Sequence, residues 1–258
     1  LMHFWVKHLR RCNGRAPQPC CVAWWSTRPG VAVGAARFVK LLFFRKGNMV
    51  ADNVVLQVEG LCFAYPECGV LNQWSVALPA GLALVRGDES SGKTTLLRLL
   101  AGELTAQAGR ITLQGVRLSD APTACAHKVF WVDPRSGDLD KLTARTWLDG
   151  LPARYPLWDA AALAAHTEGF SLNEHLDKPL YALSTGSKRK VLMAGALASG
   201  APLTLIDEPV AGLDKPSIQY LARALTSVAA QPGRLVVVAH YETLAGVPWG
   251  TVVDLART

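Results

Sequence analysis

A short apolar segment, a lysine-containing loop and a leucine-rich segment follow one another, and their order restricts the fold more than any other feature. Residues Gly81–Gly87 (GLALVRG) have the composition of a buried strand, and Thr94–Leu104 (TTLLRLLAGEL) is expected to form a helix that faces the core. Between them, GDESSGKT satisfies the spacing G-x-x-x-x-G-K-[ST]. A strand, this loop and a helix in that order predict a binding site for phosphate groups.

The residue types of the loop explain why phosphate is expected there. Glycines let the backbone turn its N–H groups inward, and the helix N-terminus adds positive dipole. Lys93 is predicted to reach the β- and γ-phosphates of ATP, and Thr94 to ligate Mg²⁺. Asp88 and Glu89 should weaken binding unless they point outward. The candidate ATP-binding residues are Gly87, Asp88, Glu89, Ser90, Ser91, Gly92, Lys93, Thr94 and Thr95.

A second apolar run, LTLID at 203–207, ends in two carboxylates. Asp207 is predicted to secure Mg²⁺, and Glu208 to polarise the attacking water. His240 ends the next apolar run, LVVVAH. Because neighbouring parallel strands end at the same edge of a sheet, we expect His240 to face the terminal phosphate. The predicted catalytic residues are therefore Lys93, Glu208 and His240.

Strand-like and helical segments alternate along the rest of the chain, which predicts an α/β fold with a largely parallel sheet. Pro216 is expected to open a helix, because proline is tolerated in the first helical turn. From about residue 134 to 182, alanine-rich and leucine-rich pieces predict a helical insertion. Further strands are expected at 53–58, 61–65, 110–118 and 128–133.

The positive charge lies at one end of the chain. The formal net charge is +7, but residues 1–48 hold nine Lys or Arg and no Asp or Glu, which leaves 18 basic and 20 acidic residues in 49–258. This near-neutral remainder argues against a nucleic-acid partner. No uninterrupted apolar stretch reaches the roughly 18 residues of a membrane span, so we expect membrane work from another chain.

Residues 1–48 are interpreted as a basic extension outside the fold of 49–258. Their arginine-rich, acid-free composition is typical of a transit peptide or a tail that lies on a membrane surface. The other interpretation is translated upstream sequence, with the true start at Met49.

Three further motifs carry a family resemblance. LSTGS at 183–187 resembles the LSGGQ signature of ATP-binding-cassette (ABC) proteins, and it precedes the Asp207-Glu208 pair at the spacing typical of that family. AGLD at 211–214 resembles the family's D-loop, and Tyr65 its adenine-stacking aromatic residue. All these elements occur in the family's order, across essentially 50–258.

The resemblance implies a P-loop NTPase core with a mainly parallel sheet, an antiparallel β subdomain and a helical subdomain at about 134–198. It implies ATP hydrolysis, with ATP and Mg²⁺ bound between two copies of the chain, most simply a homodimer. The signature residues Ser184, Thr185, Gly186 and Ser187 would complete the partner's site, with Asp214 in the D-loop. A separate integral membrane permease would hold the dimer at the cytoplasmic face of the inner (cell) membrane, docked on the helical subdomain.

The sequence departs from the family pattern at three positions. The usual Gln after the strand at 128–132 is missing, and either Asp133, which could ligate metal, or Pro134 stands in its place. Thr185 and Ser187 replace the second Gly and the Gln of the signature. These changes keep an alternative open, a soluble or degenerate ABC ATPase that acts as a nucleotide-dependent switch without transport.

Two short stretches and the compact length point to one branch of the family. GRITLQG at 109–115 and LTA at 142–144 resemble the ATP-binding subunit of the haem exporter in cytochrome c maturation. Another small exporter ATPase is the alternative, because the membrane subunit selects the cargo.

Overall fold

The computed structural model describes residues 54–120 and 125–255. The chain divides into two units, 1–48 and 49–258. The expected basic extension lies outside the described residues and stays a prediction. Among the helices of the described ranges, none combines the length and hydropathy that a membrane span requires.

A five-stranded parallel sheet forms the centre of the second unit, with the strand order β6-β7-β8-β3-β9. Its side chains alternate between two cores, as the period of two along a strand requires. Leu84 and Val238 belong to one core, whereas Val85 and Val237 belong to the other. The strands are β6 (Val129–Phe130), β7 (Leu203–Asp207), β8 (Leu235–His240), β3 (Gly81–Arg86) and β9 (Thr251–Asp254).

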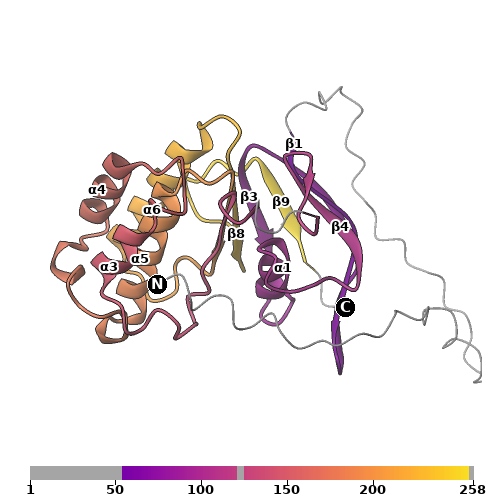
Figure 1. Cartoon of the computed structure of the whole chain (residues 1–258), viewed down its shortest axis with the longest axis horizontal. Coiled ribbons are helices and arrows are strands. Elements are labelled where there is room, and N and C mark those ends of the chain that lie inside the picture. The colour runs from indigo at the N-terminus through magenta and orange to yellow at the C-terminus, as the bar shows by residue number, and fades with distance from the viewer. Residues whose placement is uncertain (1–53, 121–124, 256–258) are drawn as a thin grey trace, which may run out of the picture. The chain divides into compact units, whose positions relative to one another are not determined.

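Different elements cover the two faces of this sheet (Figure 1). Four helices pack into one core, namely α3 (Ala144–Gly150), α4 (Ala160–Gly169), α5 (Thr185–Ala198) and α6 (Lys215–Ala229). Helix α1 (Lys93–Leu100) packs into the other core, together with an antiparallel sheet. That sheet has the order β2-β1-β4-β5 and consists of β1 (Val54–Tyr65), β2 (Cys68–Pro79), β4 (Ala108–Leu113) and β5 (Val116–Arg117). Short 3-10 turns at Asn173–His175 (η2) and Leu180–Ala182 (η3) lie between α4 and α5.

The predicted α/β architecture is confirmed, with differences at several boundaries. The two strands expected at 53–58 and 61–65 form one bulged strand, β1. The strand expected at 110–118 is a hairpin of β4 and β5, because Gln114 and Gly115 have positive φ angles of 49° and 76° and turn the chain. Helix α1 stops at Leu100, just before Gly102 with φ 76°. Strands β2 and β9 were not predicted.

Candidate nucleotide-binding site

The phosphate-binding loop lies between β3 and α1 and wraps around its own lysine. Lys93 Nζ donates hydrogen bonds to the carbonyl oxygens of Gly87 and Asp88, each at 2.8 Å. A Cβ atom at Gly87 would lie 2.5 Å from Ser91 Oγ, and Gly92 has φ 93°, so both positions require glycine. Ser90, with φ 62°, takes the same left-handed conformation although it has a side chain.

An open cleft of about 980 Å³ surrounds this loop. Its volume is in the range of small-molecule sites. Asp88 and Glu89 line the cleft and are exposed, so water screens their charges. The cleft lining comprises every predicted loop residue from Asp88 to Thr95 and also Tyr65, Cys68, Gly69, Val70, Arg135, Arg189, Glu208, Ala211 and Tyr241.

Tyr65 ends β1 at the rim of the cleft. Its side chain is 41% exposed, and its hydroxyl lies 3.4 Å from Thr95 Oγ1. Phe63 supports the ring edge-on, with the ring centroids 5.0 Å apart. An exposed, braced aromatic face beside a phosphate loop can stack on a planar base.

Thr94 and Asp207, the two predicted metal ligands, meet at the end of β7. Thr94 Oγ1 donates to Asp207 Oδ2 at 2.7 Å. The Asp207 side chain is fully buried, and burial raises its pKa above the usual range, whereas the Thr94 hydrogen bond and the Arg135 charge act in the opposite direction. A buried carboxylate of this kind requires a cation beside it.

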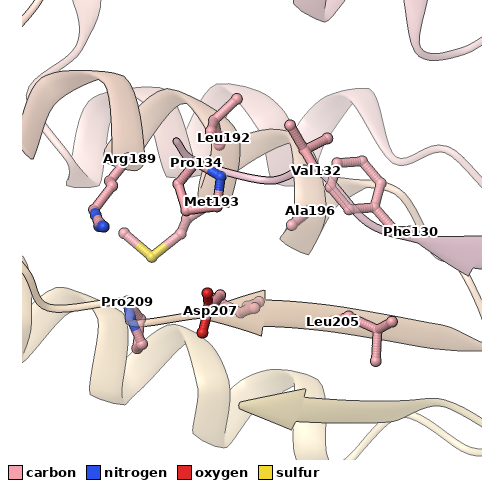
Figure 2. A pocket seen from close by; sticks show the side chains of 11 residues that line it. Phe130, Val132, Pro134, Arg189, Leu192, Met193, Ala196, Leu205, Asp207 and Pro209 are labelled. Carbon is pink, nitrogen blue, oxygen red and sulfur yellow. The ribbon is translucent and has the colours of Figure 1, made fainter. Parts of the chain in front are cut away.

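The hydroxyl oxygen of Thr94 and the carboxylate oxygens of Asp207 are of the types that bind a magnesium ion. Among the described residues, the second oxygen of Asp207, Oδ1, is buried without a hydrogen-bond partner. Carboxylate and hydroxyl oxygens are ligands that Mg²⁺ prefers. Figure 2 shows Asp207 at the end of β7, across from Arg189 and Met193 of α5, around a small cavity of about 30 Å³.

Glu208 lines the cleft and contacts two other predicted site residues. Its Oε1 lies 3.6 Å from Lys93 Nζ, and its Oε2 lies 2.9 Å from His240 Nδ1. His240 itself is only 1% exposed and is not part of the cleft lining, and its Nδ1 contacts Glu208, which does line the cleft. The expectation that His240 faces the terminal phosphate directly stays a prediction.

The signature residues lie at the N-terminus of α5 and are not part of the cleft lining. Ser184 caps this helix by accepting a hydrogen bond from Ser187 N at 3.1 Å, and Ser184 and Thr185 are exposed. Gly186 packs against the D-loop so tightly that a Cβ atom would lie 2.1 Å from Gly212 O. Asp214 caps α6 and pairs with Lys190 at 3.1 Å. One chain therefore carries a phosphate cleft and, separately, an exposed helix N-terminus.

Two arginines in the site were not predicted, and one changes the interpretation of Asp133. Asp133 accepts a hydrogen bond from the backbone N–H of Arg135 at 2.8 Å and does not line the cleft. The guanidinium of Arg135 contacts Thr94 and Asp207 instead. Arg189 is buried and donates to the backbone oxygen of Glu208 at 3.3 Å. Arg189 lies in the basic run Lys188–Lys190, and such a run is typical of a solvated surface. For this reason the sequence did not indicate that Arg189 belongs to the site.

Comparison with known proteins agrees with this geometry. The ABC transporter family model matches residues 71–211. The chain is 35% identical over 196 residues to the "Cytochrome c biogenesis ATP-binding export protein CcmA" of Pseudomonas putida, covering 76% of this chain and 93% of that protein. It is 33% identical to the protein of the same name from Legionella pneumophila, over 73% and 94% of the two chains.

A solved structure shares the fold. The "Structure of ATP binding subunit of ABC transporter" superposes with a TM-score of 0.64 at 24% identity, covering 72% of this chain and 79% of that one. With a matching family model, these relatives and a cleft built from the family's motifs, the chain belongs to the ABC transporter family, as an ATP-binding and ATP-hydrolysing subunit of a transporter.

Proposed function

We propose that two copies of this chain bind two Mg-ATP molecules between them and drive a separate membrane permease in cytochrome c biogenesis, with haem as cargo. One observation supports the proposed dimer. The cleft lining includes Lys93, Thr94 and Glu208, whereas Ser184 at the exposed start of α5 is not part of it. A helix N-terminus with free N–H groups suits an anion, here the terminal phosphate bound by a second copy.

Within one copy, the loop would hold the triphosphate through backbone N–H groups and Lys93. Lys93 already donates to two carbonyl oxygens, and its third N–H proton is available for a phosphate oxygen. Tyr65 would stack on the adenine. Thr94 and Asp207 would hold Mg²⁺, which supplies positive charge to the phosphate oxygens during transfer.

Glu208 would act as the general base. One oxygen of its carboxylate is hydrogen-bonded to His240, and the other lies 3.6 Å from Lys93 Nζ. It would orient the attacking water and accept its proton as the water oxygen bonds to the terminal phosphorus, while the bond from that phosphorus to the bridging oxygen breaks and ADP leaves. His240 would hold the carboxylate in this position by donating from Nδ1, and we assign it as a positioning residue.

The partners follow from the relatives and from the helical part of the chain. The name of the Pseudomonas relative includes export and cytochrome c biogenesis. A permease would dock on the helical subdomain, at about 134–198, and would hold the dimer at the cytoplasmic face of the inner membrane. The near-neutral charge of residues 49–258 gives no support for a nucleic-acid partner.

Glu208→Gln tests the ATP dimer, because it removes the base and keeps the shape. With saturating Mg-ATP, light scattering after size exclusion should give twice the mass of the nucleotide-free protein. The double variant Glu208→Gln, Ser184→Glu should remain monomeric, since a carboxylate at the start of α5 repels the partner's phosphate. A Glu208→Gln protein that stays monomeric even beside its membrane partner would rule out the dimer.

Complementation tests the role in cytochrome c biogenesis. A bacterium that lacks its own ATP-binding subunit for this process should regain haem-stained c-type cytochromes when this chain is supplied with its permease. The Lys93→Ala chain should not restore them. Stable Lys93→Ala protein that restores staining equally well would favour the alternative, a nucleotide switch without ATP-driven transport.

A further inference from the structure

Arg135 closes a ring of hydrogen bonds at the oxygens assigned to the metal. Its Nη2 atom lies 2.7 Å from Thr94 Oγ1 and 2.7 Å from Asp207 Oδ2. Thr94 in turn donates its single hydroxyl proton to the same Asp207 oxygen, at 2.7 Å. The hydroxyl therefore gives its one proton to Asp207, and one of its two lone pairs accepts from Arg135.

The guanidinium also supplies the positive charge that the Asp207 carboxylate needs. The Asp207 side chain has no exposed surface, and a buried carboxylate is stable only beside a cation. The Lys93 ammonium is directed to loop carbonyls and lies 3.6 Å from Glu208. Arg135 makes a direct charge-assisted hydrogen bond to the buried carboxylate.

The turn that carries Arg135 is fixed, whereas its side chain is not enclosed. The Arg135 backbone N–H donates to Asp133 Oδ1 at 2.8 Å, and Lys188 Nζ donates to Ser136 O at 2.9 Å and to Asp140 Oδ1 at 2.7 Å. The Arg135 side chain is nevertheless 60% exposed. Its guanidinium can therefore leave the ring by side-chain rotation, without unfolding the turn.

Arg135 and a metal ion compete for the same two oxygens. A cation at hydrogen-bond distance from both Thr94 Oγ1 and Asp207 Oδ2 excludes a second cation by space and by charge. While the Arg135 guanidinium occupies these oxygens, a metal ion cannot bind there, so the apparent affinity for the metal ion is lowered by the fraction of molecules in which the oxygens are free.

We propose that Arg135 is a tethered cation that occupies the metal-binding oxygens in the absence of metal and is displaced by Mg²⁺. This inference rests on the proposed role of Thr94 and Asp207. In metal-free protein, Arg135 neutralises Asp207 beside the triphosphate and so preserves nucleotide binding. When Mg²⁺ enters, the guanidinium moves away, and this movement reduces the gain in affinity that the metal provides.

The test is the metal dependence of nucleotide binding, measured by fluorescence with trinitrophenyl-ATP in EDTA and in saturating Mg²⁺. The Kd in EDTA divided by the Kd in saturating Mg²⁺ should rise about tenfold in Arg135→Gln. Without the guanidinium, Asp207 repels metal-free nucleotide, and Mg²⁺ no longer has to displace a cation from Asp207. Arg135→Lys keeps the charge and should stay near the wild-type ratio. Arg145→Gln is the matched control, since Arg145 also pairs with a carboxylate, Asp177 at 2.7 Å, but on an exposed surface.

The outcomes separate this inference from the proposed function. An unchanged ratio in Arg135→Gln, with normal binding, would overturn the tethered cation and leave the nucleotide site intact. A lower ratio in Arg135→Gln would overturn it as well. If the Lys93→Ala chain bound the probe as tightly as the wild-type chain, the nucleotide site itself would be wrong. Thermal unfolding of each variant shows whether the fold is kept. If Arg135→Gln is unstable, Arg135→Met, which also removes the charge, takes its place, and the same rise in the ratio is expected.

Discussion

His240 Nδ1 lies 2.9 Å from Glu208 Oε2 and joins the ends of two neighbouring parallel strands. Glu208 follows β7 with φ 46°, a left-handed conformation that costs about 1–3 kcal/mol for a residue with a side chain. Its backbone N–H donates to Ala239 O at 2.9 Å. An ionised carboxylate can only accept, so His240 carries its proton on Nδ1 in this pair. The strained backbone and the imidazole together aim the carboxylate into the cleft.

Removal of the imidazole should therefore lower ATP turnover more than ATP binding. We expect His240→Ala to reduce kcat about 100-fold, since a misplaced base loses most of its contribution, with little change in the Kd for ATP. His240→Gln retains an N–H donor and should recover part of the loss. Phosphate release and nucleotide binding measured on the same preparations check this. Equal losses in His240→Ala and His240→Gln would contradict a positioning role.

The contact between Gly186 and Gly212 predicts a sharp steric effect. A Cβ atom at Gly186 would lie 2.1 Å from Gly212 O, so Gly186→Ala must push the D-loop away from α5. We expect a loss of about 1–3 kcal/mol in the free energy of unfolding. Gly150→Ala, in α3, is the control, because nothing lies within 4 Å of its added Cβ. That change should be neutral or stabilise by about 0.5 kcal/mol. Chemical denaturation of both variants measures the difference.

His166 predicts a loss of stability in acid. Its Nδ1 lies 2.9 Å from the Tyr220 hydroxyl, which itself donates to Ala165 O, so the neutral ring donates to Tyr220. Burial lowers the pKa of His166 from 6.5 to about 4. The unfolded chain therefore binds a proton between pH 6.5 and 4 that the folded chain does not, and stability falls as the pH falls through this window. The loss amounts to about 3 kcal/mol by pH 4.

The variant His166→Asn separates this effect from other groups that titrate. Asparagine can still donate to Tyr220 but has no charge to gain, so its unfolding free energy should fall less between pH 7 and 4.5 than that of the wild type. Urea denaturation at several pH values measures both curves. Parallel curves would show that His166 does not cause the acid sensitivity.

Arg234 predicts a stability effect far from the nucleotide. This buried side chain donates to Ala196 O and Leu197 O, each at 2.9 Å, and so satisfies carbonyl groups at the end of α5. Arg234→Met removes the donor of Leu197 O and one donor of Ala196 O, which keeps a hydrogen bond from Ser199 Oγ at 2.7 Å, and it should cost about 2 kcal/mol. Arg117→Met is the control, because Arg117 has a half-exposed side chain and a loose ion pair to Asp120 at 3.9 Å, and should cost less than about 1 kcal/mol. A similar loss in both would contradict the capping role.

Much of the fold was predictable because its central strands carry strong local signals. The runs at 203–207 and 235–240 are buried at every position, and they agree residue by residue with β7 and β8. Strand β2 was missed, since its burial is irregular and its register against β1 shifts several times. Strand β9 is short and half exposed, and only its pairing with β3 defines it.

The candidate site divides in the same way. The loop from Gly87 to Thr95 and the carboxylates after β7 follow from the sequence, because glycine spacing and strand ends impose their positions locally. Arg135 was missed because neither its type nor its spacing relates it to Asp207, 72 residues away.

The amino-acid sequence by itself determined the chemistry that is available, a phosphate loop, an acidic strand end, a histidine and a signature, since backbone conformation and strand order depend on local residue types. Only the tertiary structure decided which groups share the cleft. It buried His240 behind Glu208, turned Asp133 toward the backbone N–H of Arg135 and placed the Arg135 guanidinium on the oxygens expected to bind metal. Such contacts depend on how a turn packs across the sheet, and a long side chain can satisfy a buried charge from a distant position in the sequence.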